Sequence, residues 1–252
     1  MIDSHLHLEA FEEPEEIIKE SLNYMTALIT SVADPKDAKL VLDLREKYKN
    51  FVFACLGFHP ECIRNYSDRE IFDYINFIKN VKNKICGIGE VGLDYSEGCK
   101  DIDKDKMKEI FVYFIELAKE LKLPLVLHTR DAFEDTLKIL ENRASEKVIF
   151  HCFTGSEEVL EKILEKENYF ISLATNIVYI KRLRRLIEKI PLERLILETD
   201  SPWLDPESPR TLTNRPWKIK FSADLISQIK KIPFEEVIEK TSKNTIKLFS
   251  LR

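Results

Sequence analysis

Short runs of apolar residues alternate with longer segments of mixed polarity along the whole chain. Each short run is rich in aliphatic and β-branched residues and has the length of a buried strand. We therefore predict eight strands, at Met1–His7, Ala27–Val32, Phe51–Gly57, Ile85–Glu90, Leu125–His128, Val148–Cys152, Tyr169–Ser172 and Leu195–Glu198.

The segments between these strands predict amphipathic helices. In the segment 104–121, for example, Met107, Phe111 and Phe114 recur at three- and four-residue spacing, which places them on one helical face. The same pattern predicts two helices after Pro216 and others at Glu15–Tyr24, Lys36–Tyr48, Arg69–Val81, Lys104–Leu121, Ala132–Glu141, Glu157–Glu165 and Ile180–Ile190.

Strict alternation of strand and helix indicates parallel strands joined by crossover helices. Eight such units in 252 residues predict an α/β fold of the (β/α)8 TIM barrel type, with residues 1–252 forming a single domain. An open, doubly wound sheet is the alternative that the pattern leaves open. The longest irregular stretch, Ser201–Pro216, follows the last strand and is expected to form a loop over the catalytic face.

The composition mainly excludes classes of protein. A hydrophobic content of 44% allows a large core, and a net charge of -5 gives no global positive field for nucleic acid. Because no apolar run is long enough to cross a bilayer and no targeting segment is visible, we expect a cytoplasmic protein without membrane contact. The five cysteines include no CxxC pair, which agrees with a reducing compartment. Nothing in the sequence indicates an obligate protein partner.

The first predicted strand carries the first candidate chemistry. Asp3, His5 and His7 alternate along it, so their side chains share one face. Two neighbouring imidazoles can chelate one divalent cation, with the nearby carboxylate orienting them. A pair of hydrogen-bonded core histidines is the alternative interpretation of this pattern.

The chain has five histidines, and each lies on or just after a predicted strand. His59 follows the third strand, His128 ends the fifth, and His151 lies in the sixth. Since the carboxyl ends of barrel strands form one face, these imidazoles are expected to meet there. Taken singly, either His128 or His151 also fits a satisfied core histidine.

Acidic residues complete the candidate site. Glu90 ends the fourth predicted strand, while Glu198 and Asp200 share a face at the end of the eighth. All three follow very apolar runs, where an unpaired carboxylate would be costly. A bound cation removes that cost, whereas a helix cap or a solvated charge is the usual role of an isolated acid.

Two divalent cations fit these positions. His5 and His7 would hold one, and His128 and His151 the other, at about 4 Å separation. Glu90 would bridge the pair, and Asp200 would bind the first cation while hydrogen-bonding the attacking water. Such a pair lowers the pKa of bridging water and supplies hydroxide near neutral pH.

The motifs that carry this chemistry resemble those of the TatD-like deoxyribonuclease family, within the amidohydrolase superfamily. The matching segments are DSHLHL (3–8), GFHPE (57–61), GIGEVGLDY (87–95), LHTRDA (127–132), HCFTGS (151–156), LETDSPWL (197–204) and EKTSKNTIKLFSL (239–251).

This resemblance implies a barrel hydrolase that uses two divalent metal ions (Mg, Mn or Zn) to cleave DNA phosphodiesters, often as a 3′→5′ exonuclease. It implies that the metal ligands are His5, His7, Glu90, His128, His151 and Asp200. It further implies that His59 and Arg130 hold substrate phosphate. For Arg130 an ion pair with Asp131 or Glu134 is the alternative.

Two segments depart from the family pattern, on the presumed substrate side. Residues 213–216 read Thr-Asn-Arg-Pro where the family commonly shows Arg-Asn-Glu-Pro, and residues 173–176 lack a frequent glycine. The basic run 181–185 could follow a nucleic-acid backbone, although such runs are more typical of a solvated helix face.

Two further function classes remain open from the sequence. A metal-dependent esterase, amidase or lactonase of the same superfamily, such as an aminoacyl-ester deacylase, would keep the metals and change the bond. A catalytically silent binding protein would keep the fold, but the intact ligand set counts against it.

Overall fold

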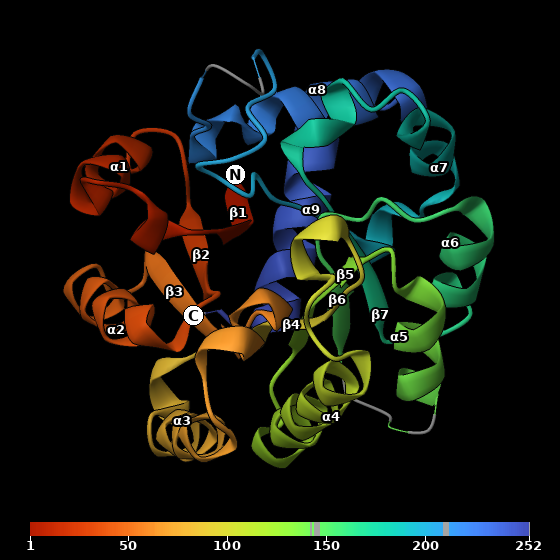
Figure 1. The fold of residues 1–252 in the computed structure, drawn as a ribbon. Helices are drawn as coiled ribbons and strands as arrows, with labels where there is room; N and C mark the ends of the chain where they lie inside the picture. Colours follow the sequence, from red (N-terminus) through yellow and green to blue (C-terminus); the bar gives the residue numbers. More distant parts are fainter. Residues whose placement is uncertain (142, 144–146, 209–211, 252) are drawn as a thin grey trace.

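The computed structural model describes residues 1–141, 143, 147–208 and 212–251, which form a ring of strands surrounded by helices (Figure 1). One sheet contains the eight strands in sequence order, and each neighbouring pair is parallel. The strands are β1 (Ile2–Leu6), β2 (Ala27–Val32), β3 (Val52–Phe58), β4 (Gly87–Asp94), β5 (Leu125–Arg130), β6 (Val148–Phe150), β7 (Tyr169–Leu173) and β8 (Leu195–Leu197).

The ring closes between the end of β1 and the segment that follows β8. The backbone N–H of Asp200 donates to the carbonyl of His5 at 3.0 Å, and that of His7 donates to Ser201 at 2.8 Å. These bonds satisfy backbone groups that an open sheet would leave at its edges. The (β/α)8 barrel prediction is therefore confirmed, and the open-sheet alternative is wrong.

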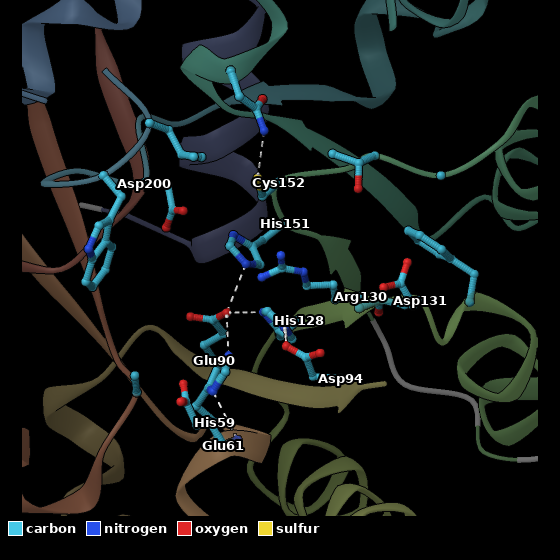
Figure 2. A pocket seen from close by; sticks show the side chains of 18 of the residues that line it. His59, Glu61, Glu90, Asp94, His128, Arg130, Asp131, His151, Cys152 and Asp200 are labelled. Atoms are coloured by element: carbon cyan, nitrogen blue, oxygen red, sulfur yellow. Dashed lines mark hydrogen bonds and ion pairs between the residues drawn. The ribbon is translucent and has the colours of Figure 1, made fainter. Parts of the chain in front are cut away.

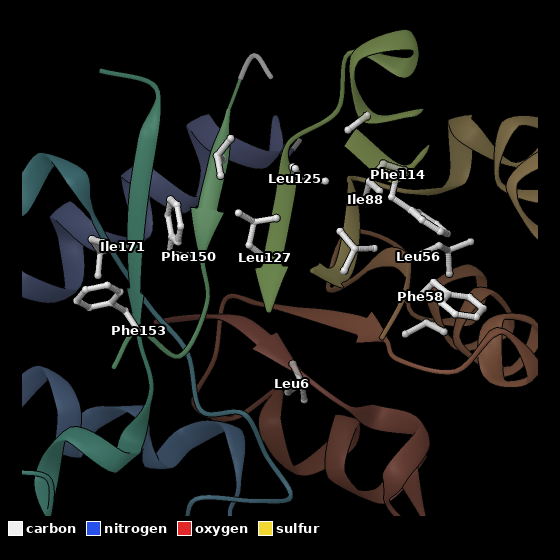
Figure 3. Packing of buried hydrophobic residues seen from close by; sticks show 14 of the residues in the cluster. Leu6, Leu56, Phe58, Ile88, Phe114, Leu125, Leu127, Phe150, Phe153 and Ile171 are labelled. Atoms are coloured by element: carbon white, nitrogen blue, oxygen red, sulfur yellow. The ribbon is translucent and has the colours of Figure 1, made fainter. Parts of the chain in front are cut away.

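Helices pack around the barrel as the periodicity predicts. They are α1 (Pro14–Ser21), α2 (Ala38–Lys47), α3 (Asp68–Asn80), α4 (Lys104–Leu121), α5 (Phe133–Glu141), α6 (Glu157–Leu164), α7 (Leu183–Lys189), α8 (Ile219–Lys230) and α9 (Phe234–Phe249). Their apolar faces bury the outward side chains of the strands: Phe114 of α4, for example, stacks on Phe58 of β3 at 6.0 Å between ring centroids. Figure 3 shows this layer between strands and helices. No described helix is long and apolar enough to cross a membrane.

All strands except β2 end one or more residues away from the predicted end, and three of these differences affect the site. β4 continues past Glu90 to Asp94, because residues 91–94 pair with residues 127–130 of β5. β6 and β8 end before His151 and Glu198, since the chain turns through left-handed backbone at Cys152 (φ 44°) and Asp200 (φ 58°). These turns place the side chains of His151, Cys152 and Asp200 at the barrel mouth.

The amino-terminal end of the barrel is closed by apolar packing. Leu248 and Phe249, at the end of α9, pack with inward residues such as Cys55 and Val126. The buried histidines and carboxylates His7, Glu90 and His151 lie at the opposite end, on the face formed by the carboxyl ends of the strands.

Two glycines allow the close backbone packing around Glu90. A Cβ at Gly57 would lie 2.3 Å from the backbone nitrogen of Glu90, and one at Gly92 would lie 1.9 Å from the carbonyl oxygen of His128. Gly92 also has a φ of 150°, which L side chains rarely adopt. These positions require glycine if β3, β4 and β5 are to approach this closely.

Candidate metal centre

The predicted site residues converge on one cavity of about 980 Å³ at the barrel mouth. Its walls include the predicted residues His7, His59, Glu90, His128, Arg130, His151 and Asp200. His5 lies directly beneath them, since its Nε2 is 3.1 Å from Nε2 of His7. Figure 2 shows Glu90 at the centre of this arrangement.

The first group of donor atoms surrounds Oε2 of Glu90. Nε2 of His5 lies 3.4 Å from this oxygen, and Nε2 of His7 lies 3.5 Å from it. Oδ1 of Asp200 is 3.7 Å from the His5 nitrogen and 3.5 Å from the His7 nitrogen. Four atoms from β1, β4 and the turn after β8 thus face a common point.

The second group surrounds the other oxygen of the same carboxylate. Oε1 of Glu90 lies 2.7 Å from Nδ1 of His128 and 2.9 Å from Nε2 of His151. Nε2 of His59 lies further away, at 3.7 Å. Glu90 therefore presents one oxygen to each group, as a bridging ligand must.

Both groups fit a divalent cation. Ligand atoms bound at about 2.1 Å lie roughly 3.0–3.4 Å from one another in octahedral or tetrahedral geometry. The donor atoms of His5, His7 and Asp200 lie between 3.1 and 3.7 Å from one another, near this spacing, and those of Glu90, His128 and His151 lie within 4.8 Å of one another. Imidazole nitrogens and carboxylate oxygens are ligands for Zn²⁺ and Mn²⁺, whereas Mg²⁺ favours oxygen.

Three further carboxylates orient the histidines from behind. Oε1 of Glu9 lies 3.0 Å from Nδ1 of His7. Oδ2 of Asp94 lies 3.0 Å from Nε2 of His128, and Oε1 of Glu198 lies 3.1 Å from Nδ1 of His151. In each case the carboxylate contacts the ring nitrogen that faces away from Glu90. Metal-bound histidines nearly always have such a partner, because it fixes the tautomer and raises the basicity of the ligand.

The sequence predicted no role for Glu9 or Asp94, and it placed Glu198 in the candidate site without identifying its partner. Each lies two or four positions from a predicted ligand, at His7, Glu90 or Asp200. The even spacing is the signal that could have found them, since alternate residues of an extended segment share a face.

Asp3 does not orient the imidazoles as expected from the strand pattern. Its Oδ1 accepts the backbone N–H of Thr199 at 2.9 Å, and its Oδ2 accepts the Thr199 hydroxyl. Nδ2 of Asn214 donates to the carbonyl of Thr199 at 3.0 Å from the other side. These bonds hold the turn that carries Asp200, so Asp3 and Asn214 position the site rather than line it.

Attraction between the histidines and the carboxylates keeps Glu90 and Asp200 ionised. Burial alone would raise the pKa of Glu90, but His151 and His128 hold it well below its ordinary value. Burial is likewise the largest influence on Asp200, and the hydrogen bond from His7 lowers the pKa of that carboxyl despite it. Both carboxylates are therefore ionised and able to bind a cation at neutral pH.

We expect metal binding to release protons. Burial would lower the pKa of His7 and of His151, but the carboxylates that contact each ring raise it well above 6.5. Without metal these rings keep their protons until the pH exceeds the raised pKa, so a cation must displace them near neutral pH. The affinity for Mn²⁺ should rise about tenfold per pH unit for each proton released.

Calorimetric titration with Mn²⁺ at pH 7, in buffers with different ionisation enthalpies, measures this release. The apparent binding enthalpy should depend on the buffer. Affinity that is constant from pH 6.5 to pH 8, with no buffer dependence, would contradict the expected protonation.

His59 and Arg130, for which the resemblance predicts contacts to substrate phosphate, both line the cavity. Burial and the neighbouring His128 lower the pKa of His59 to about 3, so its imidazole is neutral. Its Nδ1 accepts the backbone N–H of Glu61 at 3.2 Å, which leaves Nε2 as the protonated nitrogen facing the cavity. Arg130 is exposed and lines the cavity. In the described part of the chain it forms no ion pair with Asp131 or Glu134.

One of the two segments noted as departures, 173–176, reaches the cavity. Asn176 lies in its wall, as do Trp203 and Leu204 from the predicted loop Ser201–Pro216. The part of that loop at 209–211 lies outside the described residues. Of the basic run 181–185, Arg182 lines the cavity.

Comparison with known proteins places this arrangement in a family. The deoxyribonuclease TATDN3 of Homo sapiens is 33% identical, with 99% of this chain and 94% of that protein aligned. The uncharacterized metal-dependent hydrolase YabD of Bacillus subtilis is also 33% identical, over 100% of this chain and 99% of that protein. The crystal structure of YjjV, a TatD homologue from Escherichia coli, shares the fold with a TM-score of 0.90 at 24% identity, covering 100% of this chain and 98% of that one. The family model described as TatD related DNase matches residues 2–250, and the chain therefore belongs to the TatD-related DNase family.

Proposed function

We propose that this protein is a metal-dependent deoxyribonuclease that hydrolyses phosphodiester bonds. Two divalent cations would be held by His5, His7, Glu90, His128, His151 and Asp200. The observation that carries the proposal is the placement of Glu90, whose two carboxylate oxygens face two separate groups of nitrogen and oxygen donors. The relatives named as deoxyribonuclease and metal-dependent hydrolase support the same chemistry.

When bound, cations of the Mg²⁺, Mn²⁺ or Zn²⁺ type activate water and offset the negative charge that develops on the phosphodiester. Asp200 is the base in this proposal, because it is ionised and its side chain keeps 16% of its surface exposed to the cavity. It accepts the proton of the attacking water while contacting His7. Glu90 is fully engaged between the two groups and acts by holding them together.

The substrate phosphate would contact His59 and Arg130. The guanidinium of Arg130 is exposed toward the cavity and offers two parallel donors to phosphate oxygens (Figure 2). His59 would donate from Nε2 as a neutral imidazole, so its contribution is a hydrogen bond rather than a charge. These local donors explain how a chain of net charge -5 can bind a polyanion.

The test is digestion of 5′-labelled single-stranded and double-stranded DNA with Mg²⁺ or Mn²⁺, beside reactions that contain EDTA. We expect a ladder that shortens from the 3′ end and disappears with EDTA. Intact DNA from protein that holds two metals per chain would reject the nuclease proposal. The next substrates would then be carboxylic esters, lactones and aminoacyl esters of RNA.

A further inference from the structure

Trp203 presents an exposed aromatic surface at the mouth of the site. It lines the cavity, yet 52% of its surface is exposed to solvent. Its ring packs edge-on against the imidazole of His7, with 5.0 Å between ring centroids. The largest apolar side chain of the rim therefore lies next to a proposed metal ligand and keeps a face open to the cavity.

The backbone around Trp203 is held firmly without help from the ring. The N–H of Trp203 donates to the carbonyl of Asp200 at 3.0 Å, and that of Asn214 donates to Pro202 at 2.9 Å. The hydroxyl of Thr175 donates to the carbonyl of Leu204 at 2.7 Å. Because these bonds fix the turn, the exposed part of the indole is available to a ligand.

Cationic side chains line the same cavity. Arg130 comes from the end of β5, and Arg182 precedes α7, with its Nη1 3.5 Å from the carbonyl of Gly155. An aromatic face combined with arginines along a groove is the usual construction for binding unpaired nucleotides, since every base can stack. In a duplex the faces of interior bases are already stacked on their neighbours, so such a platform favours an unpaired base.

We propose that Trp203 stacks on an unpaired base of the nucleotide whose phosphate lies at the metal centre, while Arg182 contacts the neighbouring backbone phosphate. This inference rests on the deoxyribonuclease function proposed above. It adds a recognition role for a base, which the metal ligands do not provide.

A double-mutant cycle tests the stacking contact. Trp203→Ala and Trp203→Phe are compared with the unchanged protein on two single-stranded oligonucleotides, one normal and one with the base of its 3′-terminal nucleotide replaced by a tetrahydrofuran. Stacking of one base is worth a factor of about 5 to 150 in affinity. We expect Trp203→Ala to raise KM about tenfold on the normal oligonucleotide, with kcat within about threefold, and Trp203→Phe to retain most of the affinity.

The oligonucleotide without a terminal base separates stacking from a structural effect. The unchanged protein should bind it about tenfold more weakly than the normal one, and Trp203→Ala should cause no further loss. Equal losses for the variant on both oligonucleotides would overturn the proposal, because the ring would then act through His7. Phe72→Ala is the matched control, since Phe72 is an aromatic residue of α3 with 46% of its surface exposed, outside the cavity.

A readout without turnover completes the test. In a Trp217→Phe background the fluorescence reports Trp203, because the chain has two tryptophans. In the presence of Ca²⁺, the normal oligonucleotide should quench the Trp203 fluorescence. The oligonucleotide without a terminal base should not quench it. If the original protein cleaves no DNA with any metal, the proposed nuclease function fails. If the original protein cleaves DNA and Trp203→Ala has the same KM, only the stacking proposal is refuted.

Discussion

Replacing Asp200 by asparagine is expected to lower kcat by about a thousandfold while leaving the barrel folded. The amide keeps the shape of the side chain and one oxygen near His5 and His7, but it cannot accept the proton of the attacking water. The backbone bond from Asp200 to His5, which helps to close the barrel, is unaffected by the change. The measurement is kcat on labelled single-stranded DNA, together with metal content and melting temperature.

Asp205→Asn is the matched control for this variant. Asp205 lies in the loop that follows Asp200, is fully buried, pairs with Lys218 at 2.6 Å, and does not line the cavity. Its replacement should lower the melting temperature and leave kcat within a few-fold of the original. Unchanged turnover in Asp200→Asn would remove the proposed base from the reaction.

Replacing Glu90 by glutamine is expected to have a comparable effect on kcat for a different reason. A carboxylate offers an anionic oxygen to each donor group, whereas an amide offers one neutral oxygen and an NH₂ that repels a cation. We expect metal content to fall from two ions per chain to one or none, and turnover to fall by at least about a thousandfold. Native mass spectrometry or elemental analysis counts the ions.

The Glu90→Asp variant separates the effect of the negative charge at position 90 from the effect of side-chain length. The shorter carboxylate keeps the negative charge that stabilises the protonated state of His128 and His151, but it cannot span both groups. We expect it to recover one ion and little activity. Two ions bound by Glu90→Gln with the original affinity would show that Glu90 does not bridge.

The fold was predictable because its signal is local. Apolar residues that recur every three or four positions bury one helical face, and a short apolar run is buried on both sides in a parallel sheet. Both patterns depend on neighbours in the sequence, so all eight strands and their connecting helices are where the pattern predicts them. Their ends differ by a few residues, because pairing with the adjacent strand decides where a strand stops, as at Asp94.

The sequence predicted which residues gather at the candidate site, but it did not predict how they contact one another. His5, His7, His128, His151 and Asp200 lie within three residues of the carboxyl end of a strand, Glu90 lies within β4, and the barrel brings all six together. Their roles as ligands stay predictions. The sequence could not show which oxygen of Glu90 faces which histidine, because that depends on how β4 packs between β3 and β5.

The sequence by itself therefore determined the eight alternating strand and helix units and the residue types that follow the strands, whereas closure of the sheet into a barrel came from the tertiary structure. The tertiary structure alone decided the pairing of Asp3 with Thr199, the contacts of Glu9, Asp94 and Glu198 behind the histidines, and the exposure of Trp203 beside His7. Periodicity fixes which way a side chain points along its own strand. Contacts between residues distant in the chain depend on strand register, barrel closure and loop packing, which arise only when all eight strands assemble.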